Sequence, residues 1–239
     1  MNWESYYNKY TTIQDNKSFN TFIREVQDEI ANSKDIDLDW PINALSDEKK
    51  KRFVAYCFAN QIKLPQELFF PMIKAAIYEP CPSSNRSFVE PCIKTFGHRV
   101  VNLALLEVLE NGTDFEKVGA VNALYWAQVQ LTFNFAVTDY KVENATAESQ
   151  KEYSALSDIR LKKQCLYLKE FINNPNIEVR RSIIASLPLD KDSYPDALKE
   201  LVDEAIKIAR NHSDEYMRHR MEVQLGNVNI LEPLPDRNK

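Results

Sequence analysis

The chain has 239 residues, of which 44% are hydrophobic, and its 30 Lys and Arg against 35 Asp and Glu give a formal net charge of −5. Proteins that bind nucleic acid generally carry a basic excess that neutralises phosphates, so the acidic balance disfavours that class. A chain of this length is long enough to bury most of its apolar surface in one extended domain or two small ones.

The N-terminal sequence MNWESYYNKY lacks the basic segment followed by an apolar segment that defines a signal peptide. The most apolar run, Val100 to Leu109, is interrupted by Asn102 and Glu107 and is too short to span a bilayer. The cysteines are scattered and do not form the pattern of a disulfide framework. We therefore expect a cytoplasmic protein that does not associate with membranes.

Apolar residues recur at helical spacing along almost the whole chain, and only four glycines are available for the turns of a sheet. This pattern predicts an all-α protein. The expected helices are residues 3–10, 17–32, 46–62, 65–78, 87–96, 98–110, 114–130, 158–173, 177–187, 195–210 and 214–225. The segment 133–157 lacks a strong period and is expected to be an exposed insertion or mobile loop.

Several positions carry the chemistry of helix ends. Ser87 with Glu90, and Thr113 with Glu116, have the spacing of a capping box. Three glycines follow expected helices and suit the left-handed conformation of a C-terminal cap: Gly97, Gly112 and Gly226.

Three other short patterns suggest structural roles. WESYYNKY repeats aromatic residues at helical spacing from Trp3 to Tyr10, which favours a core stripe that caps the first repeat over an exposed binding patch. DIDLDW, residues 35–40, is expected to be a solvated acidic loop because it lacks the Gly and Glu of a calcium loop. KKKR, residues 49–52, is expected to form a solvated helix face.

Three turns, ENGTDFEK, NNPNIEVR and RNHSDEYMR, share one pattern. Each opens a helix with a capping residue, places a cation four residues later, and adds apolar residues three and seven positions beyond the cation. The matching positions are Thr113, Lys117, Ala120 and Leu124; Asn176, Arg180, Ile183 and Leu187; and Asp214, Arg218, Met221 and Leu225. The distance from Arg180 to Arg218 is 38 residues, near the lower end of the two-helix repeat lengths of HEAT and armadillo proteins.

On these residues the chain resembles the HEAT-repeat family, and NPNIEVRRSIIASL is the stretch that matches best. The resemblance implies antiparallel helix pairs stacked into a short right-handed α-α superhelix, which is usually a scaffold for binding other molecules. It divides the chain into an N-terminal cap or diverged repeats (1–86), HEAT-like repeats with an insertion near 133–157 (87–227), and a C-terminal tail (228–239). Gly119, inside an expected helix, would then let a neighbouring helix approach closely.

The cations of the repeat should form a ladder along one edge, paired with carboxylates of adjacent turns or facing an anionic partner. Tyr125 and Trp126, with Phe133 and Phe135 beyond them, form a second aromatic group. Burial is the favoured role for this group, and if it lines the concave face instead it is suited to an interface. The candidate partner-binding residues are Lys117, Arg180, Arg181, Arg218, Arg220, Tyr125 and Trp126.

Two sets of side chains could hold a metal ion, and structural roles are favoured for both. The first set is His212, Glu215, His219 and Glu222. The second set is Cys81, Cys92 and His98, which lacks a fourth ligand. We expect no bound metal, no cofactor and no catalytic residue.

The resemblance therefore favours a non-catalytic interaction protein that binds a protein partner on a concave face. An alternative is a DNA-repair enzyme resembling the HEAT-like alkylpurine DNA glycosylases, in which Trp126 and Asp114 would serve the cleft. The net acidity disfavours this alternative, and nucleic acid is not an expected partner. A small-molecule lyase or hydroxylase on the same scaffold has too few candidate ligands.

Overall fold

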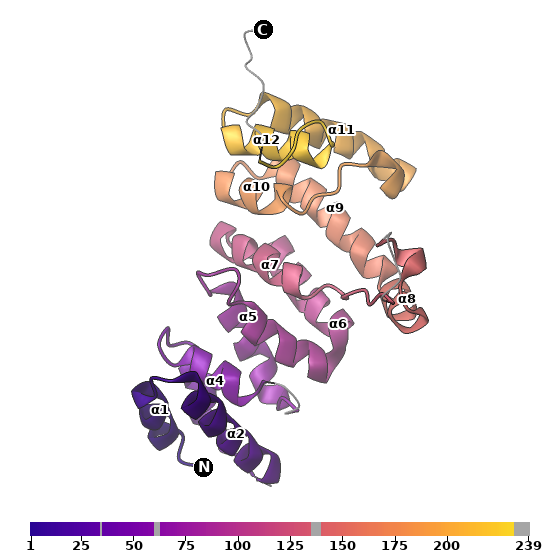
Figure 1. Cartoon of the computed structure of the whole chain (residues 1–239). Helices are drawn as coiled ribbons and strands as arrows, with labels where there is room; N and C mark the ends of the chain where they lie inside the picture. The colour runs from indigo at the N-terminus through magenta and orange to yellow at the C-terminus, as the bar shows by residue number, and fades with distance from the viewer. Residues whose placement is uncertain (34, 60–62, 135–139, 232–239) are drawn as a thin grey trace. The chain divides into compact units, whose positions relative to one another are not determined.

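The computed structural model describes residues 1–33, 35–59, 63–134 and 140–231. Within these residues the chain is all-helical, as predicted, and β pairing is limited to an isolated bridge between Phe133 and Ala145. The α-helices in Figure 1 are α1 (Trp3–Thr12), α2 (Asn16–Asn32), α3 (Asp39–Ala44), α4 (Lys51–Cys57), α5 (Phe69–Ile77), α6 (Arg86–Asn111), α7 (Asp114–Trp126), α8 (Ala147–Ser154), α9 (Ser157–Asn173), α10 (Ile177–Ile184), α11 (Asp196–Asn211) and α12 (Glu215–Gln224). None of these helices combines the length and apolar content needed to cross a bilayer.

The chain forms two compact units. Unit 1 comprises Met1–Leu105 and Asn122–Gln128, and unit 2 comprises Leu106–Val121 and Val129–Lys239. Helices α6 and α7 therefore contribute residues to both units.

In unit 1, α1 packs on α2 and α3, and α4 packs on α2 and α3. The aromatic stripe of α1 also reaches α4, since the ring of Trp3 lies 6.0 Å from that of Phe58 and the ring of Tyr10 lies 5.1 Å from that of Phe53. Of the stripe, Trp3 is buried as predicted, whereas its three tyrosines are half-buried. Burying aromatic rings of this size is a large part of what stabilises so small a helical unit.

In unit 2, α9 and α10 form one hairpin and α11 and α12 form a second. The first helices of the hairpins, α9 and α11, pack on each other, and so do the second helices, α10 and α12 (Figure 1). Neither hairpin could bury its apolar stripe alone, so the stripes meet between them. Four side chains at this junction are completely buried: Val179, Ile183, Met217 and Met221.

The helix predicted over 46–62 is wrong for 46–50, where the chain forms turns. The acidic loop predicted for 35–40 is confirmed for 35–38, which are non-helical with Asp35 and Asp37 exposed, and is wrong for the last two residues, which begin α3. Helix α3 begins at Asp39, whose backbone N–H donates to Asp37 Oδ1 at 3.0 Å. A turn then intervenes, because Asp47 Oδ1 accepts from the backbone N–H groups of Lys49 and Lys50. Such local side-chain caps compete with a continuing helix, and α4 starts only at Lys51. Residues 60–62 lie outside the described residues.

The predicted glycine caps divide into two kinds. Gly97 (φ +81°) and Gly226 (φ +73°) adopt the left-handed conformation as predicted, the first as a kink within α6 and the second after α12. Gly112 does not, and its prediction is wrong. A Cβ at Gly112 would lie 2.6 Å from the carbonyl oxygen of Val108, so glycine fits there because the backbone passes too close for a side chain.

The two predicted capping boxes also differ. Thr113 Oγ1 accepts from Glu116 N at 3.4 Å, and Glu116 Oε2 accepts from Thr113 N at 2.9 Å, which confirms the box at the start of α7. The box at Ser87 is wrong, since Ser87 Oγ donates to Ser84 O at 2.7 Å. Its expected partner Glu90 accepts instead from Arg86, because α6 starts one residue earlier than predicted.

The predicted insertion contains a helix that its weak period concealed. Helix α8 starts at Ala147, where Thr146 Oγ1 accepts from Ser149 N, and Ser149 is its buried residue. Because this helix buries one small polar side chain, its sequence lacks the apolar spacing from which a helix is predicted. Phe135 and the rest of residues 135–139 lie outside the described residues.

Candidate interaction site

Arg180 and Arg218, two of the three cations of the repeat, close the turns of their own hairpins. Arg180 donates to the carbonyls of Phe171 and Ile172 at 3.0 and 3.1 Å, at the end of α9. Arg218 donates to the carbonyls of His212 and Ser213, both at 2.7 Å, just after α11. The last carbonyls of a helix have no partner within it, so each arginine satisfies groups that the turn would otherwise expose.

The third cation of the repeat and the two other predicted arginines also have partners within the chain. Lys117 Nζ lies 2.8 Å from Glu170 Oε1, and both side chains are mostly buried. Arg181 Nη2 lies 2.5 Å from Asp214 Oδ2. Arg220 donates to the carbonyl of Ala185 at 3.4 Å. All five predicted cations are thus engaged in intramolecular contacts.

Side-chain contacts join the first turn of α7 to the start of α10, and the last turn of α10 to the start of α12, in unit 2. Asp114, in the first turn of α7, accepts from the side-chain amides of Asn174 and Asn176 at 2.8 and 3.0 Å. Asn176 caps α10, and Arg181 of α10 pairs with Asp214, the cap of α12. The hydrogen bond from Arg181 lowers the pKa of the Asp214 carboxyl below its usual value. Two of the predicted cap residues, Asn176 and Asp214, therefore also bond to a neighbouring helix.

The predicted aromatic group is divided between a fixed ring and an exposed one. Trp126 Nε1 donates to the carbonyl of Pro82 at 2.8 Å, and the guanidinium of Arg86 lies 5.5 Å from the Trp126 ring. Tyr125 is 57% exposed and meets Trp126 edge-on at 5.0 Å, so the favoured burial is wrong for Tyr125. Tyr125 is therefore the predicted aromatic that is most available to a partner.

The histidines and carboxylates considered as metal ligands are separated by other contacts. His212 Nδ1 accepts from the backbone N–H of Asp214 at 3.1 Å, at the end of α11. Glu222 pairs with Arg210 at 2.9 Å. Over the described ranges, no group of three His, Cys, Asp or Glu side chains is arranged to hold a metal ion.

The cysteine set is equally dispersed. Cys92 is buried, and burial raises the pKa of its thiol to about 12, whereas Cys81 is exposed. His98 Nδ1 lies 2.9 Å from the carbonyl oxygen of Ala127, which also accepts from the buried Asn102. These contacts hold the end of α7 against α6 within unit 1, a structural role.

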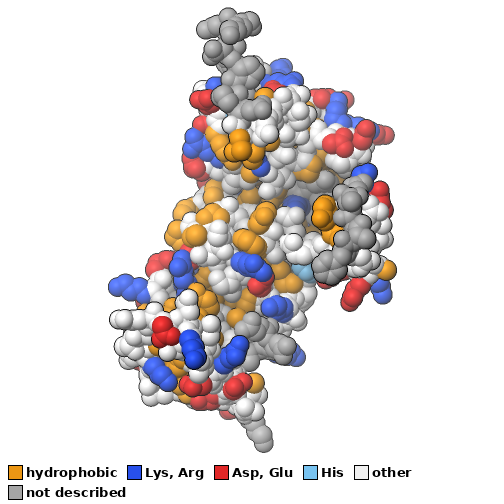
Figure 2. Space-filling view, viewed as in Figure 1, with side chains coloured by type: hydrophobic (Ala, Val, Ile, Leu, Met, Phe, Trp, Pro, Cys, Tyr) orange, Lys and Arg blue, Asp and Glu red, His pale blue; other side chains and the backbone are white. Residues whose placement is uncertain are grey.

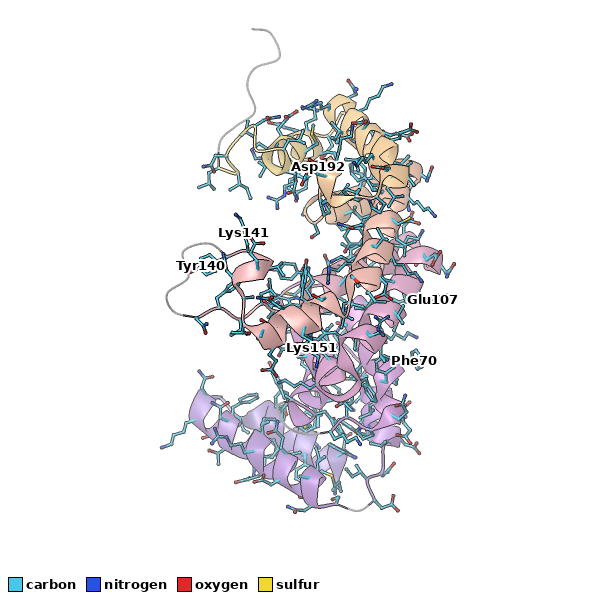
Figure 3. All side chains as sticks on the ribbon, turned by 90° about the vertical axis from the view of Figure 1, so that its right-hand side faces the viewer. Phe70, Glu107, Tyr140, Lys141, Lys151 and Asp192 are labelled. Carbon is cyan, nitrogen blue, oxygen red and sulfur yellow. The ribbon has the colours of Figure 1, made fainter. Side chains whose placement is uncertain are left out.

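Unit 1 contains a surface pocket of about 510 Å³ that the sequence reasoning did not predict. It lies between the segment 42–51, which joins α3 to α4, and the outward side of α5. Its lining residues are Ile42, Leu45, Ser46, Glu48, Lys51, Phe70, Pro71, Lys74, Ala75 and Tyr78. Phe70, labelled in Figure 3, projects from α5 and is 69% exposed. A volume of several hundred Å³ with apolar walls is typical of ligand-binding pockets.

Lys51 is a buried cation in the wall of this pocket. Its side chain is 2% exposed, and its Nζ lies 2.8 Å from Glu48 Oε2 and 3.2 Å from Glu79 Oε2. Glu79 is also buried and receives Arg52 Nη2 at 2.9 Å. Burial raises the pKa of Glu79, but the hydrogen bonds from Arg52 and Lys51 outweigh it and leave the pKa below its usual value. The two buried charges are therefore held as an ion pair.

The prediction that KKKR forms a solvated face is thus wrong at Lys51. The sequence contained one signal for the pocket: Phe69 and Phe70 are consecutive, and adjacent residues cannot both face the core from one helix. The structure buries Phe69 and exposes Phe70.

Comparison of the chain with models of protein families, with curated proteins and with solved structures gave no match. The resemblance to HEAT repeats therefore rests on the residues of the three turns.

Proposed function

We propose that the protein is a non-catalytic interaction protein, a small HEAT-like scaffold that binds a protein partner, and that the pocket of unit 1 is a contact site. The observation that carries this proposal is the exposure of two aromatic side chains, Phe70 (69%) and Tyr78 (38%), around a preformed pocket. In protein interfaces, a few aromatic side chains at well-packed pockets typically supply most of the binding energy. Large exposed apolar groups of this kind commonly mark interaction sites.

The packing of unit 2 supports a repeat scaffold. Hairpins that stack first helix on first and second on second are the unit of construction in helical-repeat proteins. The contacts of Asn176 with Asp114 and of Asp214 with Arg181 give each hairpin polar contacts with a neighbouring helix as well. Such scaffolds present side chains on a rigid framework, which suits partner binding.

No observation favours the DNA glycosylase alternative. Both residues that it would recruit are engaged elsewhere, Trp126 with Pro82 and Asp114 with Asn174 and Asn176. On the face shown in Figure 2, Lys and Arg side chains are interspersed with Asp and Glu.

The proposal can be tested with an affinity-tagged chain in its own host. Partners of the wild type would be identified by mass spectrometry, purified, and titrated against wild type, Phe70→Ser and the control Tyr216→Ser, whose tyrosine in unit 2 is 45% exposed. We expect Phe70→Ser to weaken binding by roughly 10-fold or more, and the control to leave it unchanged. A partner that binds all three proteins equally would place the interface elsewhere, and the absence of any direct partner would remove the proposed function.

A further inference from the structure

Three charged side chains line the pocket: Glu48, Lys51 and Lys74. Over the described part of the chain, no carboxylate lies within ion-pairing distance of Lys74, whose Nζ stands 5.9 Å from the ring centre of Tyr78. The rim of the pocket therefore carries a cation without an anion, although the whole chain has a net charge of −5.

The two carboxylates that pair with Lys51 differ in how easily each could be displaced from it. The side chain of Glu79 is 1% exposed and also holds Arg52, whereas that of Glu48 is 66% exposed. If Glu48 turned away, Lys51 Nζ would keep Glu79 and the carbonyl of Tyr78 at 3.3 Å. Glu48 thus occupies an exchangeable anion position, and a carboxylate from a ligand could replace it without leaving a buried charge unpaired.

Apolar surface adjoins both cations. Leu45 and Ala75 are buried beneath the pocket, and Phe70 and Tyr78 stand exposed beside it. A ligand that satisfied the cations alone would leave this surface in water. The complementary ligand carries an apolar side chain next to a carboxylate.

We propose that the pocket binds an acidic segment of a partner protein, with an apolar side chain against Phe70 and Tyr78 and a neighbouring carboxylate on Lys74 and Lys51 in place of Glu48. This recognition mode rests on the interaction role proposed above and names the chemistry of the partner.

A random peptide library displayed on phage tests the specificity directly. Selection on the full chain should enrich peptides in which Asp or Glu lies beside Leu, Ile, Met or Phe. Enrichment of apolar or basic peptides without carboxylates, or no enrichment, would overturn the proposal.

The best-enriched peptide, labelled with fluorescein, then serves as the probe for variants in an anisotropy titration. Lys74→Glu should weaken binding by about 5-fold or more, since it places a like charge beside the peptide carboxylate. Glu48→Gln should strengthen binding by about 2- to 5-fold, because it removes the internal competitor. Lys169→Glu, an exposed lysine of α9 in unit 2, makes the same change of net charge as Lys74→Glu and should have no effect.

The opposite signs expected for Lys74→Glu and Glu48→Gln separate local recognition from a general charge effect. If Lys169→Glu weakens binding as much as Lys74→Glu, or if Glu48→Gln weakens it, the proposed contacts are wrong. If a native partner depends on Phe70 but has no acidic segment at the interface, recognition of an acidic segment is wrong and the proposed interaction role is retained. If no direct native partner exists, the proposed interaction role itself is wrong.

Discussion

Lys51 shows how a residue that looks like surface charge becomes part of the core. It lies in a run of four cations, yet its side chain is 2% exposed and pairs with the buried Glu79. Helical spacing cannot predict this, because the turn fixed by Asp47 decides which face of α4 looks inward. A buried pair of this kind tolerates loss of one partner poorly, since the other charge stays buried.

Replacing Lys51 with methionine should lower the free energy of unfolding by about 3 kcal/mol, because the partly exposed Arg52 would be the one remaining cation beside the buried Glu79. The exposed Lys49→Met serves as control and should change stability by no more than about 0.5 kcal/mol. Urea unfolding followed by circular dichroism measures both. A Lys51→Met loss as small as that of the control would show that the pair adds nothing to stability.

The pH dependence of this difference tests its cause. In the wild type the lowered pKa of Glu79 gives stability that is complete above the unfolded pKa and is lost as the pH falls through the native pKa. The variant lacks part of that stabilisation, so the gap between the two proteins should narrow on acidification from about pH 7 toward pH 4. A gap that is constant over this range would point to lost packing of the lysine stem instead.

At Gly112 a single close contact decides whether a substitution raises or lowers the stability of the protein. Helix propensity alone favours Ala over Gly by about 1 kcal/mol, but a Cβ here would lie 2.6 Å from the carbonyl oxygen of Val108. We expect Gly112→Ala to destabilise the protein by about 1 to 3 kcal/mol, as overpacking does. The neighbouring exposed Asn111→Ala is the control, and thermal melting compares the two. A higher melting temperature for Gly112→Ala would mean that the backbone relaxes at little cost.

At the scale of elements, the predictions succeeded where a cap and an apolar stripe coincide. The four helices of unit 2 from α9 to α12 lie close to their predicted ranges, because Asn176 and Asp214 mark two of the starts and buried stripes follow. They failed for α3 and α8, which are short: α3 packs on α1 and α4, and α8 is capped by the side chain of Thr146. Sequence periodicity carries no information about elements of that kind.

Asp214 caps one helix and pairs with a residue of another, so replacing it should remove both stabilising interactions. Its carboxylate caps α12 through Met217 N at 2.9 Å and pairs with Arg181 of α10. Asp214→Ala should cost about 1 to 2 kcal/mol, the upper part of the range for a lost N-cap. Asp196→Ala, whose side chain is 97% exposed in a pair with Lys199, should cost less than about 0.5 kcal/mol.

The pH dependence of the free energy of unfolding should show the contribution of the Asp214 carboxylate. The pKa of Asp214 is lowered in the native state, so its stabilisation is present above the unfolded pKa and disappears as the pH falls through the native value. The difference between wild type and Asp214→Ala should therefore be largest at neutral pH and shrink below about pH 4. Equal losses for Asp214→Ala and Asp196→Ala at neutral pH would contradict the role of the cap in bonding to a neighbouring helix.

At the scale of the whole molecule, the candidate site was less predictable than the helices. The cations of the predicted repeat do not form a free binding surface, because Arg180 and Arg218 satisfy the carbonyls of their own turns. The pocket instead combines residues from 42–51 and 70–78, which no shared spacing connects. Positions that recur in a repeat are those the architecture itself needs, so a site that occurs once leaves no periodic signal.

The net negative charge of the chain predicts that the protein does not bind DNA. A protein that binds DNA through phosphates needs cations free to replace counterions, and its affinity falls steeply as salt is raised. Here the net charge is −5, and cations such as Lys117 and Arg181 are paired with Glu170 and Asp214. We expect no saturable binding of a fluorescein-labelled duplex, with or without an alkylated base, even at low ionic strength. The charge variant Glu48→Gln serves as a sensitivity control, because non-specific attraction would grow as an acidic group is removed. Binding that saturates and weakens with added salt would instead revive the glycosylase alternative, with Trp126 and Asp114 as the first residues to replace.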